Sequence, residues 1–328
     1  MSNPPLGYFE SLINFRDRRF TFDADCVGAE VRFSYKGQYF LICFPYFDFS
    51  DRGGFGHPKP TFQGTRLTMK WLIRESDRDS FGRANSWNDN SQEVRNFTCN
   101  QFVVRSRGRM TAAEARVAKK HLVSWRESFA KWFEVLEYED LTNDGSKVRQ
   151  AESLESFFIP ADKSKTERRI KSVIERQPVA ITVVLTDGVP RASLKRVLRL
   201  SASGLYPPGY YAQLISALKY FNREEYRQSI LDSATAFETS LIKLLDDRLA
   251  TAAAGQRKLI EDKYGQIVNL SIALRALGEA LPPQNDIQTK IAQPRNRAIH
   301  QGVEPSESQA KDALLFAKSF IYSKFPLR

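Results

Sequence analysis

The arrangement of apolar residues changes character at the segment SASGLYPPGYY, residues 201–211. Before this segment, apolar and aromatic residues alternate with polar ones in short runs, which is typical of half-buried β-strands. After it, apolar residues recur at steps of three and four, which is typical of amphipathic helices. The chain has 328 residues, enough for two domains that each bury a core. We therefore predict an α+β protein with a β-rich α+β domain over residues 1–200 and an all-α helical bundle over residues 207–328.

The first 200 residues contain several strand signals and one long helix signal. In VRFSYKGQYFLICFPYF (31–47), the turn residues Lys36-Gly37 divide an aromatic, β-branched run into a predicted hairpin. A helix is predicted over Ala112–Tyr138, and the polar segment DSFGRANSWNDNSQ (79–92) is predicted to be a loop. The expected core stripe of this helix is Val117, Leu122, Trp125, Phe129, Trp132 and Leu136. Further strands are predicted at Arg66–Arg74, Phe97–Arg105, Val179–Leu185 and Leu194–Leu200.

The second half contains helix signals and no convincing strand. The predicted helices are Tyr210–Phe221, Arg223–Leu249, Ile267–Leu281 and a last one after Pro305. Pro282-Pro283 are expected to stop the third helix, and Ser306 with Gln309 forms a capping-box pattern at the start of the last.

The net charge of +11 is concentrated in the middle of the chain. Residues 161–200 hold 10 Lys and Arg against 4 Asp and Glu, an excess of six positive charges. Such a basic segment suits a polyanion such as RNA, although a solvated basic face that keeps the protein soluble is an equally good interpretation.

Several classes of protein are excluded by what the sequence lacks. No apolar run approaches the about 20 residues that span a bilayer, and the first residues do not resemble a signal peptide, so we expect a cytoplasmic protein without membrane contact. Three cysteines without a C-x-x-C pair argue against a disulfide framework or a zinc site. The histidines His57, His121 and His300 are too scattered for a metal centre, and the glycines of residues 53–56 lack phosphate-loop spacing. We expect no metal and no cofactor.

The segment PRNRAIHQG (294–302) holds the candidate chemistry, because it places Arg295, Asn296 and His300 in the order R-N-x-x-x-H. Arginine binds phosphate through a permanently charged fork, and histidine exchanges protons near neutral pH. Pro294 is expected to begin a short helix here. His300 would then lie about 140° around and about 7.5 Å along that helix from Arg295. The structural alternative is a buried histidine at a helix end that caps a carbonyl.

Glu238 is the fourth candidate, because it falls within the apolar stripe of the longest helix of the second half. A carboxylate there is unfavourable unless a cation or several hydrogen bonds compensate it, and Arg295 and Asn296 are suitable partners. The alternative is a glutamate at the helix edge whose carboxylate reaches water.

Two runs of the second half together resemble the prokaryotic HEPN domains (higher eukaryote and prokaryote nucleotide-binding). They are NREEYRQSILDSATAFETSLIKLL (222–245) and PRNRAIHQGVEPSESQAKDALLFAKSFI (294–321). HEPN domains are all-α bundles with an arginine, usually an asparagine, and a histidine four to six positions beyond the arginine. The resemblance covers about residues 207–328 and leaves the first 200 residues unassigned.

The resemblance implies a homodimer in which two motifs form one groove, and often metal-independent cleavage of RNA. His300 would be the general base, Arg295 the phosphate clamp, Asn296 a backbone or phosphate contact, and Glu238 the residue that positions Arg295. The chain would be an endoribonuclease that acts as a toxin or an anti-phage abortive-infection effector. Its N-terminal domain would sense a protein or phage-derived trigger, restrain the activity, or bind the target. The alternative is a non-catalytic HEPN module for dimerisation and for binding nucleotides or RNA.

Overall fold

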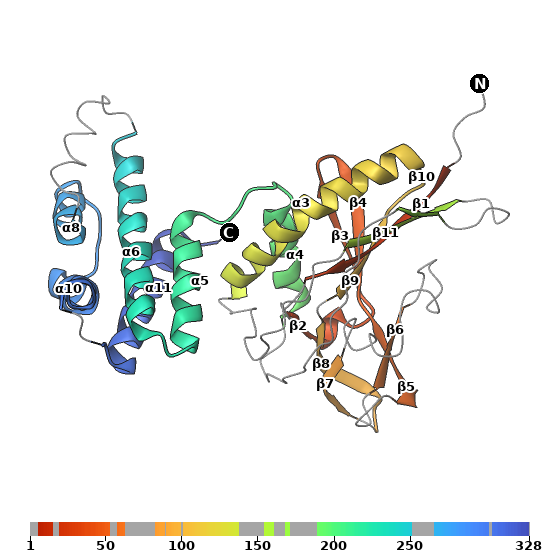
Figure 1. The fold of residues 1–328 in the computed structure, drawn as a ribbon, viewed down its shortest axis with the longest axis horizontal. Helices are drawn as coiled ribbons and strands as arrows, with labels where there is room; N and C mark the ends of the chain where they lie inside the picture. The colour runs from red at the N-terminus through yellow and green to blue at the C-terminus, as the bar shows by residue number, and fades with distance from the viewer. Residues whose placement is uncertain are drawn as a thin grey trace. The chain divides into compact units, whose positions relative to one another are not determined.

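The computed structural model of the chain (Figure 1) separates into two compact units, Met1–Tyr206 and Pro207–Arg328. It describes residues 6–15, 20–52, 58–62, 83–88, 90–99, 101–137, 154–160, 168–170, 189–250, 266–301 and 304–327. The first unit is rich in strands and the second consists of helices, so the protein has an α+β composition. Whether the two units are domains that fold independently, with the boundaries expected above, stays a prediction. None of the helices in the described segments has the length and apolar character needed to cross a membrane.

The first unit is built on a curled antiparallel sheet with the strand order β12-β11-β1-β9-β4-β3, to which β10 adds beside β1. Three further strands form the sheet β2-β8-β7, and β5 pairs with β6. The strands are Leu6–Asn14 (β1), Phe20–Asp23 (β2), Glu30–Tyr35 (β3), Gln38–Cys43 (β4), Tyr46–Arg52 (β5), Pro58–Thr61 (β6), Arg83–Asn88 (β7), Glu93–Cys99 (β8), Gln101–Ser106 (β9), Met110–Thr111 (β10), Leu154–Pro160 (β11) and Arg168–Ile170 (β12).

The predicted hairpin is confirmed as the pair β3–β4. Its turn residues Lys36 and Gly37 have φ angles of 48° and 77°, the left-handed values that a two-residue hairpin turn requires. Glycine takes this conformation without steric cost, which explains why the pattern could be read from the sequence.

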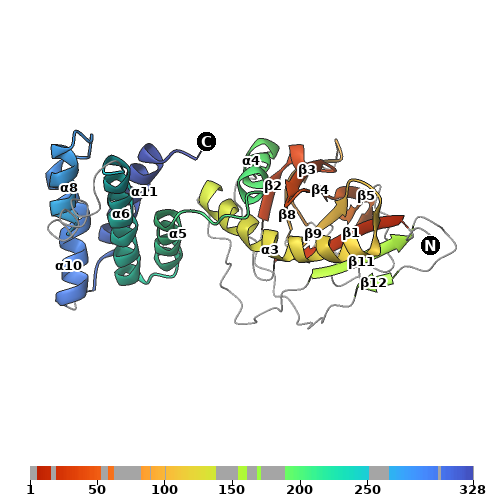
Figure 2. The same cartoon turned by 90° about the horizontal axis from the view of Figure 1, so that it is seen from above.

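The long helix α3 (Ala112–Glu137) is also confirmed, and it covers one face of the main sheet (Figure 2). Its Trp125 ring stacks on Phe33 of β3 at 4.5 Å between centroids, and its Phe129 contacts Phe15 and Phe20. The Trp125 indole N–H donates to Ser201 Oγ at 3.0 Å, so this buried ring leaves no polar group unsatisfied. Val117 does not join the core stripe as predicted, because 45% of it is exposed.

Three predictions of secondary structure in the first unit are wrong. Residues 194–200 form no strand but lie in the helix α4 (Arg191–Ser201), where Leu194, Val197, Leu198 and Ser201 are buried at steps of three and four. The Asp25 carboxylate accepts hydrogen bonds of 2.9 and 3.0 Å from the Arg191 N–H and so caps the start of this helix from a distant segment.

The other two errors concern β7, β8 and β9. The predicted loop 79–92 contains the strand β7. Its buried Ala84 pairs with Phe97 of β8, and the register between β7 and β8 shifts along its polar residues. The predicted strand Phe97–Arg105 is two strands, β8 and β9, that belong to different sheets. The predicted strands at residues 66–74 and 179–185 lie outside the described residues, as do four of the ten basic residues of 161–200.

The second unit contains the predicted helices. They are α5 (Gly209–Asn222), α6 (Tyr226–Arg248), α8 (Ile267–Ala276), α9 (Gln284–Ile287), the π-helical turn η4 (Gln288–Ala292), α10 (Gln293–His300) and α11 (Glu307–Lys324). Helices α5, α6 and α11 pack against one another, and the buried Phe237 ring lies 4.7 Å from the Phe320 ring. The predicted capping box at the start of α11 is confirmed by reciprocal bonds between Ser306 and Gln309 of 3.3 and 3.0 Å.

The two ends of this unit meet. The Tyr210 ring stacks on Phe325 at 4.6 Å, and the Tyr211 hydroxyl donates to the Phe325 carbonyl oxygen. These contacts join the beginning of α5 to the residue that follows α11.

Helix α8 ends at Ala276, five residues earlier than predicted, because Gly278 terminates it. Gly278 has a φ of 84°, its N–H donates to the Arg275 carbonyl, and the Glu279 N–H donates to the Leu274 carbonyl. This pair of bonds is a Schellman motif, which requires the left-handed conformation that glycine supplies. The motif fixes the position of Glu279, the next residue.

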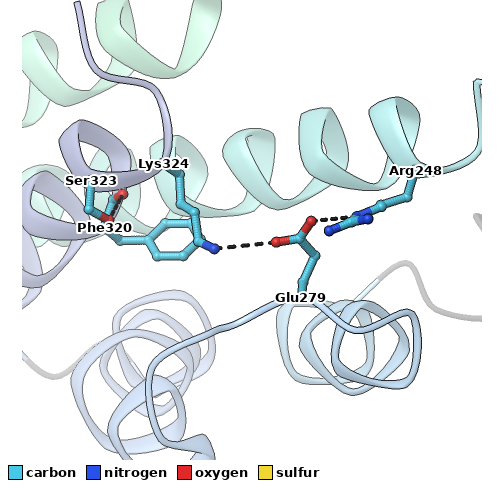
Figure 3. A network of polar contacts seen from close by, with 5 residues as sticks. All are labelled: Arg248, Glu279, Phe320, Ser323 and Lys324. Atoms are coloured by element: carbon cyan, nitrogen blue, oxygen red, sulfur yellow. Dashed lines mark hydrogen bonds and ion pairs between the residues drawn. The ribbon is translucent and has the colours of Figure 1, made fainter.

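Glu279 joins three segments of the second unit (Figure 3). Its carboxylate accepts from Arg248 Nε at the end of α6 at 2.5 Å and from Lys324 Nζ at the end of α11 at 3.3 Å. Only 11% of the Glu279 side chain is exposed. Burial by itself raises the pKa of this carboxyl, but the hydrogen bonds and charges of Arg248 and Lys324 outweigh burial and lower the pKa below its usual value.

We predict that Glu279→Gln destabilises the protein by about 1–3 kcal/mol at pH 7, because two charge-assisted hydrogen bonds are weakened. The folded pKa lies below the unfolded pKa of about 4.3. The stabilisation is therefore complete above that value and is lost as the pH falls through the folded pKa. Urea unfolding at several pH values should show the gap between wild type and variant closing below about pH 4.

Asp247→Asn is the matched control, because it removes a carboxylate of α6 that forms an exposed ion pair with Lys243. This change should alter the unfolding free energy by less than about 0.5 kcal/mol. A difference in unfolding free energy between wild type and Glu279→Gln that stays the same at acid pH would show that the ionised Glu279 carboxylate is not its cause.

Candidate functional site

Pro294 lies in the first turn of α10, close to the predicted helix start, but the backbone before it is already helical. The backbone is helical from Gln284, directly after Pro283, through α9, η4 and α10 to His300. Proline lacks the N–H of the normal ladder, and its ring collides with the carbonyl four residues earlier. The turn before Pro294 is π-helical, and the Gln293 N–H donates to the Gln288 carbonyl, five residues back. This wider turn accommodates the proline without ending the helix.

The predicted partnership between Glu238 and Arg295 is present. An Arg295 Nη atom lies 3.6 Å from Glu238 Oε2, which joins α10 to the middle of α6. The side chains are 35% and 21% exposed, so the carboxylate is also accessible to water, as expected for a helix-edge position. Because the pair is partly open to solvent, it orients the Arg295 guanidinium rather than adding much stability. The fork of Arg295 retains donors beyond this contact.

Arg227 provides a second link between α6 and α10 that sequence reasoning missed. Its Nε donates to the Ala298 carbonyl oxygen at 2.9 Å. That carbonyl is among the last four of α10, which have no partner within their own helix, and a cation there also matches the helix dipole. Arg227 precedes Glu238 by 11 residues, or about 20° of rotation on an ideal helix, so both residues lie on one face of α6. This spacing of 11 residues is the sequence signal from which the role of Arg227 could have been predicted. Ala298 is buried, and its small side chain permits close packing of the two helices.

His300 is exposed at the last residue of α10, and Asn296 is exposed near its beginning. The alternative of a buried histidine that caps a carbonyl is therefore wrong, because the His300 side chain is exposed. Within the described residues, no hydrogen bond to the His300 ring is found. The Gln301 N–H donates to the Arg297 carbonyl at 3.0 Å, so the backbone is held in helical form through His300. Gly302, which the motif includes, lies outside the described residues.

Arg295, Asn296 and His300 thus share one helix, and Glu238 contacts the first of them. Arg295 and His300 are five residues apart in continuous helix, so the expected separation of about 7.5 Å along the axis applies. A long arginine and an imidazole at this spacing can address one phosphodiester from two sides. The arrangement offers a fixed cation, an amide and a proton acceptor at a surface open to a polymer.

The remaining sequence candidates do not form a second centre. The His121 Nδ1–H donates a 3.0 Å hydrogen bond to Gln38 Oε1, and the ring lies against Tyr35. Burial and the nearby Lys36 lower the pKa of His121. The three thiols are buried, and burial raises the pKa of Cys43 to about 12, which makes a thiolate nucleophile unfavourable.

Two further observations concern metal and phosphate sites. Over the described parts of the chain, no cluster of three or more His, Cys, Asp or Glu side chains suits a metal ion. His57 and the glycines of residues 53–56 lie outside the described residues.

Comparison with known proteins yields no match to this chain among protein-family models, curated proteins or solved structures.

We predict that Arg227→Gln loosens the end of α10 that carries His300. Loss of a charge-assisted hydrogen bond of about 1.5 kcal/mol corresponds to about tenfold faster amide exchange in that turn. Hydrogen-exchange mass spectrometry of a peptide covering residues 293–301 would detect this change. Lys311→Gln, which removes an exposed cation of α11, is the matched control and should leave the peptide unchanged. Equal exchange in both variants would show that Arg227 does not hold the helix end.

Proposed function

We propose that the protein is a metal-independent endoribonuclease of HEPN type, acting through Arg295, Asn296, His300 and Glu238. The observation that carries the proposal is the ion pair between Glu238 and Arg295, because it sets a phosphate-binding cation on the same short helix as an exposed histidine. The resemblance of residues 207–328 to HEPN domains supports the same assignment. The cation alone would suffice for binding, whereas the histidine adds the capacity for proton transfer.

The reaction is a transesterification within the RNA chain. Neutral His300 removes the proton of a ribose 2′-hydroxyl, and the oxygen attacks the adjacent phosphorus. A new bond forms between O2′ and phosphorus while the bond to O5′ of the next nucleotide breaks. That oxygen takes a proton from water, and the proton held by His300 neutralises the hydroxide that remains. The products are a 2′,3′-cyclic phosphate and a 5′-hydroxyl, and no oxidant or reductant is involved. DNA lacks the nucleophile and would remain intact.

Arg295 stabilises the charge that accumulates on the non-bridging oxygens as phosphorus becomes five-coordinate. Glu238 restricts the rotamers of Arg295, so that less conformational entropy is lost when phosphate binds. Asn296, exposed one residue further along α10, contacts the sugar–phosphate backbone.

In the proposed assembly, two copies of the chain pair through their helical units, and their motifs line one groove. A ribonuclease of this kind would act as a toxin or an anti-phage effector in the cytoplasm. The strand-rich unit would sense a protein or phage-derived trigger.

We predict that the wild-type protein cleaves single-stranded RNA in the presence of EDTA and that His300→Ala slows cleavage by about 10²–10⁴-fold, the usual contribution of a general base. The exposed position of His300 means that the variant should keep its unfolding midpoint. Mass spectrometry should identify the cyclic phosphate and the 5′-hydroxyl. His121→Asn is the matched histidine control and should cleave at the wild-type rate.

Equal activity of wild type and His300→Ala would overturn the role of His300. If neither protein cleaves but both bind RNA, and Arg295→Ala weakens that binding, the non-catalytic module becomes the better description. Growth of cells that express wild type or Arg295→Ala provides an inexpensive first comparison.

A further inference from the structure

A group of exposed arginines lies beside two tyrosines at one end of the main sheet in the first unit, on the face opposite α3. The ladder places residues of neighbouring strands directly beside one another: Arg32 pairs with Leu41, Leu41 with Arg105, and Arg105 with Glu10. Directly paired residues project from the same face of a sheet. Phe33, the neighbour of Arg32 along β3, projects the other way and stacks on Trp125 of α3. The row that begins at Arg32 therefore faces away from that helix.

Tyr39 lies next to this row and is 64% exposed, although it is a large aromatic side chain. Its direct partner on β3 is Ser34, which is small and exposed. On the other side, the Arg107 N–H donates to the Tyr39 carbonyl at 3.2 Å, so exposed Arg107 is the lateral neighbour on the β9 side. The small serine and the exposed arginine leave the tyrosine ring open to a planar ligand.

A second tyrosine and arginine extend the surface. Tyr8 precedes Glu10 by two residues on β1 and so projects from the same face. The Arg109 guanidinium lies 5.7 Å from the centre of the Tyr8 ring, and its Nε donates to the Tyr8 hydroxyl at 3.0 Å. We call these residues the Tyr39 surface: Tyr8, Arg32, Ser34, Tyr39, Arg107 and Arg109.

The exposed charge of this region is mostly positive. The strands and turns that build it, residues 6–14, 30–43 and 101–111, contain only two acidic residues, Glu10 and Glu30. Glu10 is buried, and Glu30 is engaged by Arg105. The exposed arginines Arg32, Arg107 and Arg109 therefore face solvent beside two tyrosine rings.

We propose that the Tyr39 surface binds single-stranded nucleic acid, with a base stacked on Tyr39 and phosphates held by Arg107 and Arg32. A sheet face with exposed aromatics and surrounding cations is suited to unstacked bases, because every base offers a π-face and every nucleotide a phosphate. A duplex hides its bases and so could not use Tyr39. This binding requires no cleavage and does not depend on the function proposed for His300.

The test is a fluorescence-anisotropy titration of the full-length protein at several salt concentrations. Two probes of about 12 nucleotides, within the usual site size, separate DNA from RNA: oligothymidylate and 2′-O-methyl oligouridylate. Neither probe can undergo the proposed cleavage, so the result is independent of catalysis. The variants are Tyr39→Ser and Arg107→Gln, with Arg116→Gln as control because it removes an exposed cation of α3, on the other side of the sheet.

Tyr39→Ser should weaken binding by about tenfold without changing the salt dependence, since a stacked base contributes about 1–3 kcal/mol. Arg107→Gln should reduce the slope of log K against log salt by about 0.7, the loss of one phosphate contact on a single strand. Arg116→Gln should do neither. If the variants weaken the binding of both probes, the surface recognises base and phosphate on either sugar. If they weaken the binding of one probe, the surface is assigned to that nucleic acid.

Wild-type affinity and slope in both Tyr39→Ser and Arg107→Gln would overturn the proposal, and an acidic protein would become the better partner for these cations. Tyr39 is exposed, so an unchanged unfolding midpoint for Tyr39→Ser would exclude misfolding as the cause of lost binding.

Discussion

Pro294 interrupts the hydrogen-bond ladder of the helix that carries Arg295, Asn296 and His300. The π-helical turn before it absorbs the interruption by adding one residue to that turn. One added residue rotates everything that follows by about 100° relative to an uninterrupted α-helix. The direction in which Ala298 packs and Arg295 projects is thus set by this turn, and with it the contacts of α10 to α6. The candidate site depends on a local irregularity, which is a common origin of functional geometry in helices.

Two arginine contacts then hold the rotated helix in place, and they differ in kind. Arg227 binds a backbone carbonyl and so fixes the position of the helix end whatever side chains it carries. Arg295 binds a side-chain carboxylate through a longer, partly solvated contact that leaves its guanidinium available to another anion. The Arg227 contact is suited to maintaining structure. The Arg295 contact is suited to exchanging partners, because breaking a solvated ion pair costs little free energy.

Local signals in the sequence predicted much of the fold. Lys36-Gly37 and the Ser306–Gln309 capping box act through their immediate neighbours, and both could be read directly. The errors arose where distant contacts decide the conformation: α4 is capped by Asp25, more than 160 residues away, and β7 takes its strand form from pairing with β8. For the site, the partnership of Glu238 with Arg295 followed from the cost of a carboxylate in an apolar stripe. Arg227 was missed because its partner is a backbone carbonyl, which no residue type marks.

The meeting of Tyr210 and Tyr211 with Phe325 has a consequence for the topology of the helical unit. Its first helix and its last residues are direct neighbours, so its chain forms a nearly closed ring. A short peptide could join these ends while new termini are opened at the exposed turn 223–225 between α5 and α6. The unit therefore has the geometry of a circularly permutable module, in which the order of helices along the chain can change while their packing is retained.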